Sequence, residues 1–240
     1  MVMKRNILSW ILVYAVVLGG FWCICHFGSK AVTAMKQEDL VVGRKCIVID
    51  AGHGGVDGGT TSCTGVTESN LNLETAIRLN DFLHLIGIDT KMIRTTDCSV
   101  YTSGETIAAK KVSDLKERVR IVETTPNGIL VSIHQNFFAQ SIYSGAQVFY
   151  GSNKDSLSLA KTLQTNLIST VNPGSKRSAK KATGIYLMEH VSCPAILIEC
   201  GFLSNPQEEA LLRSSDYQKK LCCVIGNTLS EFINSSPSAT

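Results

Sequence analysis

GILVSIH, at residues 128–134, is the clearest indication of the fold class of this 240-residue chain. Such an unbroken apolar run is typical of a strand buried on both faces, as in a parallel sheet covered by helices. Similar runs occur at 47–51 (IVIDA) and 195–198 (AILI). Helical patterns alternate with these strands, which predicts an α/β fold: a mixed, mostly parallel, twisted sheet with helices on both faces.

The expected helices are identified by apolar residues at helical spacing and by residues that end or cap a helix. One is expected at 71–86, with Gly87 just past its end. The polar stretch 95–111 is expected to form a loop, and Ser113 is the expected cap of the next helix. The other helices are expected at 156–171, after the cap Asn205, and at 216–233.

Residues 1–28 are predicted to be a membrane anchor or a secretion signal. Lys4 and Arg5 precede a mostly apolar stretch at 7–27, whose 21 residues match the length of a membrane-spanning helix. Basic residues before such a stretch favour a cytoplasmic N-terminus, so the rest of the chain would be exported. A cleaved signal is the alternative, because residues 32–34 (VTA) resemble a processing site. The length of the apolar run favours the uncleaved anchor.

The remaining chain is predicted to comprise a tether at 29–43, one catalytic domain at 44–234 and a tail at 235–240. Hydrophobic residues make up 44% of the chain, enough for a packed core. From residue 44 onward, 19 basic residues face 18 acidic ones, so nothing indicates a nucleic-acid partner. The nine cysteines are odd in number and show no Cys-x-x-Cys spacing, so no disulfide framework is expected.

Two histidines and two glutamates lie at or just beyond the ends of predicted strands: His53, Glu68, His134 and Glu199. In open α/β sheets, ligands bind outside the carboxyl ends of the strands, so these distant residues can converge on one site. Two imidazoles and a carboxylate form a zinc-binding set that leaves a coordination position open. A further carboxylate can move protons. The pattern therefore points to one Zn²⁺ ion and metal-assisted hydrolysis.

Each of these residues also has a simpler interpretation. His53 lies in a glycine-rich turn and could be a solvated loop residue, and His134 could be a hydrogen-bonded core residue. Glu68 could be an acidic residue that a helix N-terminus favours. Glu199 is harder to explain in this way, because a carboxylate at the end of an apolar strand is costly to bury without a cation or a metal.

Three motifs resemble, in order, those of the zinc-dependent N-acetylmuramoyl-L-alanine amidases of the amidase-3 family. They are VIDAGHGG at 48–55, SIHQN at 132–136 and AILIECGFLSN at 195–205. The resemblance spans about residues 45–233. LKERV at 115–119 and GIYLM at 184–188 resemble the germination-specific amidases of spore-forming bacteria within that family. Ala51, where the family usually has proline, and Cys200 depart from its pattern without removing an expected ligand.

The resemblance implies that His53, Glu68 and His134 hold one Zn²⁺ ion and that Glu199 is the catalytic base. The implied reaction is cleavage of the amide between N-acetylmuramic acid and L-alanine of the peptidoglycan stem peptide, in spore cortex during germination. A partner deacetylase would then complete the formation of muramic-δ-lactam.

Three other residues are candidates for substrate contact or for support of the ligands: Asp50, Arg94 and Asn136. The implied location is extracytoplasmic, anchored in the membrane through the N-terminal helix or secreted, on the forespore or cortex side of a sporulating bacterium. An accessory extracytoplasmic protein is a further candidate partner. Two alternatives stay open: an exported zinc peptidase with the same ligands, and a non-catalytic wall-binding protein of the same fold.

Overall fold

The structure is a computed structural model that describes residues 16–23, 26 and 43–235. The chain divides into two units, Met1–Arg44 and Lys45–Thr240. In the first unit, residues 16–23 are helical with exposed side chains. Most of the expected anchor at 7–27, and nearly all of the expected tether and tail, lie outside the described residues. Within the described ranges, no helix combines the length and the apolar character needed to span a bilayer.

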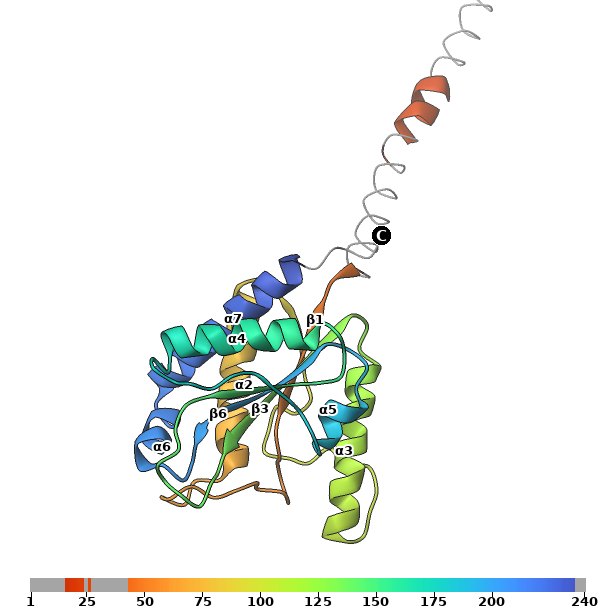
Figure 1. Ribbon diagram of the computed structural model, residues 1–240. Helices are drawn as coiled ribbons and strands as arrows, with labels where there is room; N and C mark the ends of the chain where they lie inside the picture. The colour runs from red at the N-terminus through yellow and green to blue at the C-terminus, as the bar shows by residue number, and fades with distance from the viewer. Residues whose placement is uncertain (1–15, 24–25, 27–42, 236–240) are drawn as a thin grey trace, which may run out of the picture. The chain divides into compact units, whose positions relative to one another are not determined.

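A six-stranded sheet organises the second unit (Figure 1). Its strands are β1 (Cys46–Ala51), β2 (Asp89–Met92), β3 (Gly128–Asn136), β4 (Gln147–Tyr150), β5 (Lys180–Lys181) and β6 (Ala195–Phe202). The strand order is β2-β1-β3-β6-β4-β5, and β4 runs antiparallel to β6 while the other neighbours are parallel. The prediction of a mixed, mostly parallel sheet is confirmed.

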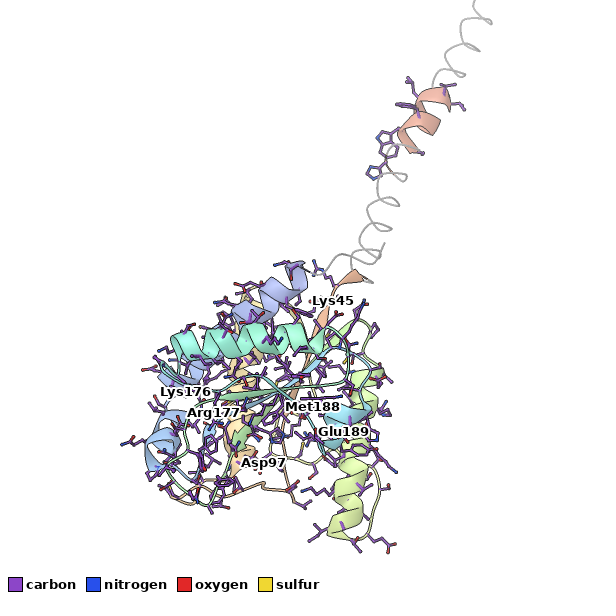
Figure 2. The ribbon with its side chains drawn as sticks, in the orientation of Figure 1. Lys45, Asp97, Lys176, Arg177, Met188 and Glu189 are labelled. Atoms are coloured by element: carbon purple, nitrogen blue, oxygen red, sulfur yellow. The ribbon has the colours of Figure 1, made fainter. Side chains whose placement is uncertain are left out.

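Helices cover both faces of this sheet, as predicted (Figure 1). They are α2 (Glu68–Leu85), α3 (Ile107–Glu123), α4 (Ser156–Thr170), α5 (Tyr186–His190), α6 (Pro206–Leu212) and α7 (Ser215–Ser235). Buried residues of α2, α4, α6 and α7 form one core cluster with the sheet, and buried residues of α3 and α5 form a second. On α5, Met188 is buried in the second cluster while Glu189 is exposed (Figure 2).

The alternation of side chains along each strand decides which polar groups share a face. Ile129, Val131 and Ile133 of β3 belong to the core cluster of α2, α4 and α7, whereas Leu130 belongs to that of α3 and α5. Because side chains alternate with a period of two, His134 falls on the same face as Leu130. By the same rule, the members of β1, β3 and β6 on the α3–α5 face include Asp50, Ser132, His134 and Glu199.

The start of α3 differs from the expectation. The helix begins at Ile107, so its first turn lies in the stretch that was expected to be a loop. Thr106 is the cap, and its hydroxyl accepts a hydrogen bond from the backbone N–H of Ala109 at 3.1 Å. Ser113 lies inside the helix, where its hydroxyl accepts from the N–H groups of Thr102 and Ser103. Ser113 therefore fastens the preceding loop to the helix.

We predict that Thr106→Ala lowers the free energy of unfolding by about 1 kcal/mol, because the first turn of α3 loses its side-chain acceptor. Urea denaturation of the wild type and the variant measures the difference. Thr106→Ser keeps the hydroxyl and should stay close to the wild type. Equal stability of all three proteins would contradict the assignment of Thr106 as the cap.

Candidate metal centre

The pairing of β3 with β6 brings two of the predicted site residues together. His134 and Glu199 are Cα partners in this parallel pair. The neighbouring strand, β1, ends at Ala51, and His53 lies in the turn that follows. Glu68 is the first residue of α2, and only 4% of its surface is exposed. The carboxyl ends of the parallel strands therefore meet at this edge, as predicted.

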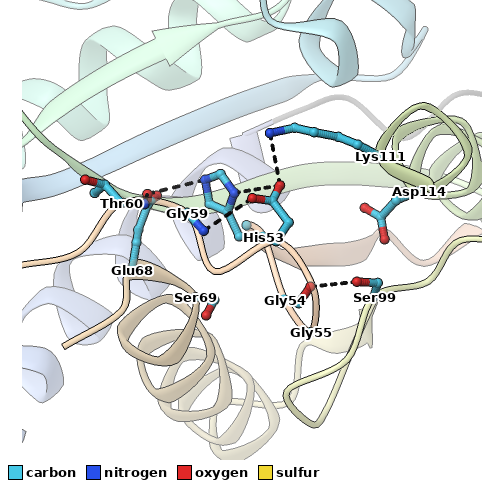
Figure 3. A network of polar contacts seen from close by, with 12 residues as sticks. His53, Gly54, Gly55, Gly59, Thr60, Glu68, Ser69, Ser99, Lys111 and Asp114 are labelled. Carbon is cyan, nitrogen blue, oxygen red and sulfur yellow. Dashed lines mark hydrogen bonds and ion pairs between the residues drawn. The ribbon is translucent and has the colours of Figure 1, made fainter. Parts of the chain in front are cut away.

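Three of these side chains form a compact cluster of metal-ligand type. Glu68 Oε2 lies 3.3 Å from His53 Nε2 (Figure 3). Glu68 Oε1 lies 2.9 Å from His134 Nδ1. One ligand atom of each residue lies within 4.8 Å of the other two. The two imidazole rings meet edge-to-face, with centroids 5.0 Å apart. The structure thus brings together the three residues that were expected to hold a metal.

The Glu68 carboxylate is held ionised by its neighbours. Burial alone would favour its neutral form, but hydrogen bonds from His134 and His53 outweigh burial and lower the pKa of Glu68 well below its usual range. Backbone N–H groups of Thr60 and Gln135 also donate to this carboxylate. A preformed anion between two imidazoles is a suitable place for a divalent cation.

Glu199 behaves differently, because its carboxylate has little support. Its Oε2 is buried and has no hydrogen-bond partner among the described residues. Burial raises the pKa of Glu199 to about 7, while the nearby His134 acts in the opposite direction. A carboxyl group with a pKa near neutrality can both accept and donate a proton at physiological pH.

Two buried arginines hold the turn that carries His53. Arg94 donates from Nε to the carbonyl of Ala51 at 2.8 Å, and from Nη2 to those of Gly52 at 3.0 Å and Ser69 at 2.8 Å. Arg118 donates from Nη2 to the carbonyl of His53 at 2.7 Å. These bonds stabilise a turn in which His53 has a φ of 62°, a left-handed conformation that is uncommon outside glycine.

Asp50, another predicted site residue, is the counter-ion of Arg118. Its carboxylate pairs with the Arg118 guanidinium and accepts a hydrogen bond from the Ser132 hydroxyl at 2.6 Å. Burial raises the pKa of Asp50, but Arg118 and His134 outweigh burial and lower it. Asn136 ends β3, and its carbonyl accepts from the N–H of Leu203. Arg94 and Asp50 therefore support the backbone around the cluster.

Sequence reasoning missed Asp57, which contacts the second ring nitrogen of His53. Asp57 Oδ2 lies 3.1 Å from His53 Nδ1 and 3.2 Å from Lys111 Nζ (Figure 3). A carboxylate that accepts from the far nitrogen of a histidine fixes its tautomer and leaves the other nitrogen available as a ligand. The spacing offered a signal, because Asp57 follows His53 by four residues in the same glycine-rich turn.

The donor set fits zinc. Its three groups are one carboxylate and two imidazoles, which bind metal in their neutral form. Such groups are the ligands of zinc sites that leave a coordination position open. Bonds of about 2 Å to one ion would require donor atoms within about 4 Å of each other, and the cluster is close to that size. The unpartnered Oε2 of Glu199 fits a site in which a further group is still to be bound.

Comparison with known proteins places the chain in a family. Residues 47–231 match the model of the N-acetylmuramoyl-L-alanine amidase family, and the chain belongs to this family. A germination-specific N-acetylmuramoyl-L-alanine amidase of Bacillus subtilis (strain 168) is 36% identical over 192 residues, which are 79% of this chain and 80% of the relative.

Solved structures agree with this assignment. The CwlD amidase from Clostridioides difficile, solved in complex with the GerS lipoprotein, has a TM-score of 0.77 and 35% identity, over 80% of this chain and 100% of that one. An N-acetylmuramoyl-L-alanine amidase from Clostridium difficile 630 has a TM-score of 0.71 and 30% identity, over 81% of this chain and 99% of that one.

We predict that Gly52→Ala destabilises the domain by about 1–3 kcal/mol, because overpacking has this cost. A Cβ atom at this position would lie 2.2 Å from His134 Nε2, so the imidazole would have to move. Urea denaturation measures the change. Gly58→Ala is the matched control in the same turn, since its Cβ would meet only Thr67 Cγ2, at 3.8 Å. Equal effects of the two substitutions would contradict the prediction.

Proposed function

We propose that this protein is a zinc-dependent amidase that cleaves the bond between N-acetylmuramic acid and L-alanine of the peptidoglycan stem peptide. Membership of the amidase family supports the reaction class. The observation that carries the proposal is the buried, unpartnered carboxylate oxygen of Glu199 beside the cluster of His53, Glu68 and His134. The proposal is tested by mass spectrometry of muropeptides after peptidoglycan is incubated with the zinc-loaded full chain. The expected product is a stem peptide with a free amino group on its L-alanine.

Zinc would be held by His53, Glu68 and His134, with Nε2 of His53 and Nδ1 of His134 directed at the site. When bound, zinc supplies a Lewis acid that polarises a carbonyl oxygen and lowers the pKa of water. Asp57 holds the imidazole of His53 in place through Nδ1. The buried arginines, Arg94 and Arg118, hold the backbone of the same turn.

Glu199 is proposed to move the proton of the reaction. Its carboxylate accepts a proton from the attacking water as the water oxygen bonds to the amide carbon. It then donates that proton to the nitrogen as the carbon–nitrogen bond breaks, so the amine of L-alanine departs neutral. The raised pKa of Glu199, about 7, suits both steps.

The cellular role is proposed from the relatives. The Bacillus subtilis relative is germination-specific, so we propose action on spore cortex, in the extracytoplasmic space, with a deacetylase completing muramic-δ-lactam. The Clostridioides difficile relative was solved with a lipoprotein, and an accessory protein of that kind is a proposed partner here. Residues 7–27 are proposed as the anchor or signal that exports the domain.

The environment of Glu199 favours an enzyme over a non-catalytic wall-binding protein, because burial of a carboxylate oxygen without a hydrogen-bond partner is costly.

We predict that Glu199→Gln keeps about one zinc ion per chain and lowers the rate of amide hydrolysis at least about 100-fold, since general acid–base catalysis contributes that much or more. Metal analysis and turnover of purified muropeptides measure the two quantities separately. His134→Ala is the comparison, and it should lose both zinc and activity. Retained turnover in Glu199→Gln would reject the role of this residue.

We also predict that Asp57→Asn weakens zinc binding about 10- to 100-fold, because the amide is a poorer partner for the far nitrogen of His53. Competition with a chelator of known affinity measures the change without reference to activity. Asp216→Asn is the control, since Asp216 is an exposed residue of α7 paired with Lys219. An unchanged zinc affinity in Asp57→Asn would show that the contact with His53 has no bearing on the metal.

A further inference from the structure

A cavity of about 490 Å³ extends from the candidate metal centre along the start of α3. Its inner end is lined by His53, His134 and Glu199. Its outer wall carries Lys110 and Lys111, which we call the basic rim. The reaction proposed above needs no cation at this wall, so the basic rim requires a separate explanation.

The charges of this cavity leave its outer wall positive. Four carboxylates line the cavity: Asp50, Asp57, Asp114 and Glu199. Arg118 pairs with both Asp50 and Asp114, and Glu199 lies at the inner end. Asp57 is the acid at the basic rim, and it divides its Oδ2 between Lys111 and His53.

Lys110 has a different neighbour. Its ammonium lies over the ring of Tyr101, 5.2 Å from the centroid, and no ion pair to a carboxylate is found for it among the described residues. The ring attracts the cation through its quadrupole and carries no formal charge, so the ammonium is not neutralised by this contact. The apolar part of the wall includes Tyr101, Tyr186 and Ile107, the last 73% exposed. The wall is therefore suited to a ligand with apolar carbons and a negative group.

The distance between the basic rim and the candidate metal centre limits where the negative group of such a ligand can lie. Asp57 Oδ2 bridges Lys111 Nζ and His53 Nδ1 at 3.2 and 3.1 Å, so the ammonium lies roughly 6 Å or less from the imidazole. Two extended residues of a peptide span about 7 Å. A carboxylate on the second residue after the scissile amide can therefore reach the basic rim while the amide is at the centre.

We propose that Lys110 and Lys111 form a subsite for a free carboxylate on the second residue of the stem peptide, counted from the bond that is cleaved. This subsite rests on the proposed amidase function and adds a preference to it. The acid form of that residue is preferred to its amidated form, because an amide gives the two ammonium groups no charge to pair with. The preference weakens as salt is added, since the basic rim is open to solvent.

Two synthetic substrates test the proposal: N-acetylmuramoyl-L-alanyl-D-glutamate and its α-amide, N-acetylmuramoyl-L-alanyl-D-isoglutamine, each with the γ-carboxyl group blocked as a methylamide. They differ only in the α-carboxyl group, which is a free carboxylate in the first and an uncharged amide in the second. For the zinc-loaded full chain, kcat/KM should be about tenfold higher for the acid, as two partly exposed charge pairs allow. The double variant K110M/K111M should bring the ratio of the two kcat/KM values close to one, by raising KM for the acid relative to KM for the amide.

Two further variants separate the subsite from other effects. Lys116→Met changes an exposed lysine of the same helix that does not line the cavity, and it should keep the full preference. Lys110→Met leaves the contact between Lys111 and Asp57 in place, so it should lower the preference without changing zinc affinity.

The outcomes distinguish this proposal from the amidase function itself. Cleavage of both substrates with equal kcat/KM, or a preference that persists in K110M/K111M, overturns the subsite and leaves the amidase function standing. Cleavage of neither substrate by the zinc-loaded wild type overturns the amidase function and, with it, the subsite. Binding of both compounds to Glu199→Gln by calorimetry gives a readout without turnover, and tighter binding of the acid supports the subsite.

Discussion

The parallel pairing of β1, β3 and β6 sets the positions of the candidate site residues. Parallel strands end at the same edge of a sheet, so the residues after them are brought together without any local sequence relation. The register of β3 against β6 sets His134 beside Glu199. A shift of one residue would turn one of these side chains to the opposite face and separate them. The apolar strand residues of the core therefore fix the register of the strands, and with it the relative positions of the site residues.

The charges behind the site are balanced by groups that the fold supplies. Asp50 lies in the buried part of β1 and pairs with Arg118, and Arg118 also pairs with Asp114 and donates a hydrogen bond to the backbone of the turn. An unpaired charge in this position would be costly, whereas a paired one can fix the backbone around it. Arg94 also holds this turn, by donating hydrogen bonds to the carbonyls of Ala51 and Gly52. The left-handed conformation of His53 is held in this way by two cations.

The cavity follows from unequal coverage of the sheet. Long helices cover one face, while the other face has α3 and the short α5 (Figure 1). The site side chains lie on this second face, and the cavity extends from them between the start of α3 and the segment at 184–187. A peptide attached to a glycan strand needs an open cleft of this kind, and the basic rim adds a charged group at a defined distance from the reacting bond.

The fold class and the four candidate site residues could be predicted from the sequence, because apolar runs indicate buried strands and polar side chains at or just beyond their ends indicate a site. His53, Glu68, His134 and Glu199 could be chosen in this way. The sequence did not reveal the start of α3, because a single cap such as Thr106 resembles any loop threonine. Arg118 and Lys111 act through contacts with Asp50 and Asp57, which lie in a segment far from them in the chain. These contacts could be found only from the folded structure, since long-range pairing and burial leave no local pattern in the sequence.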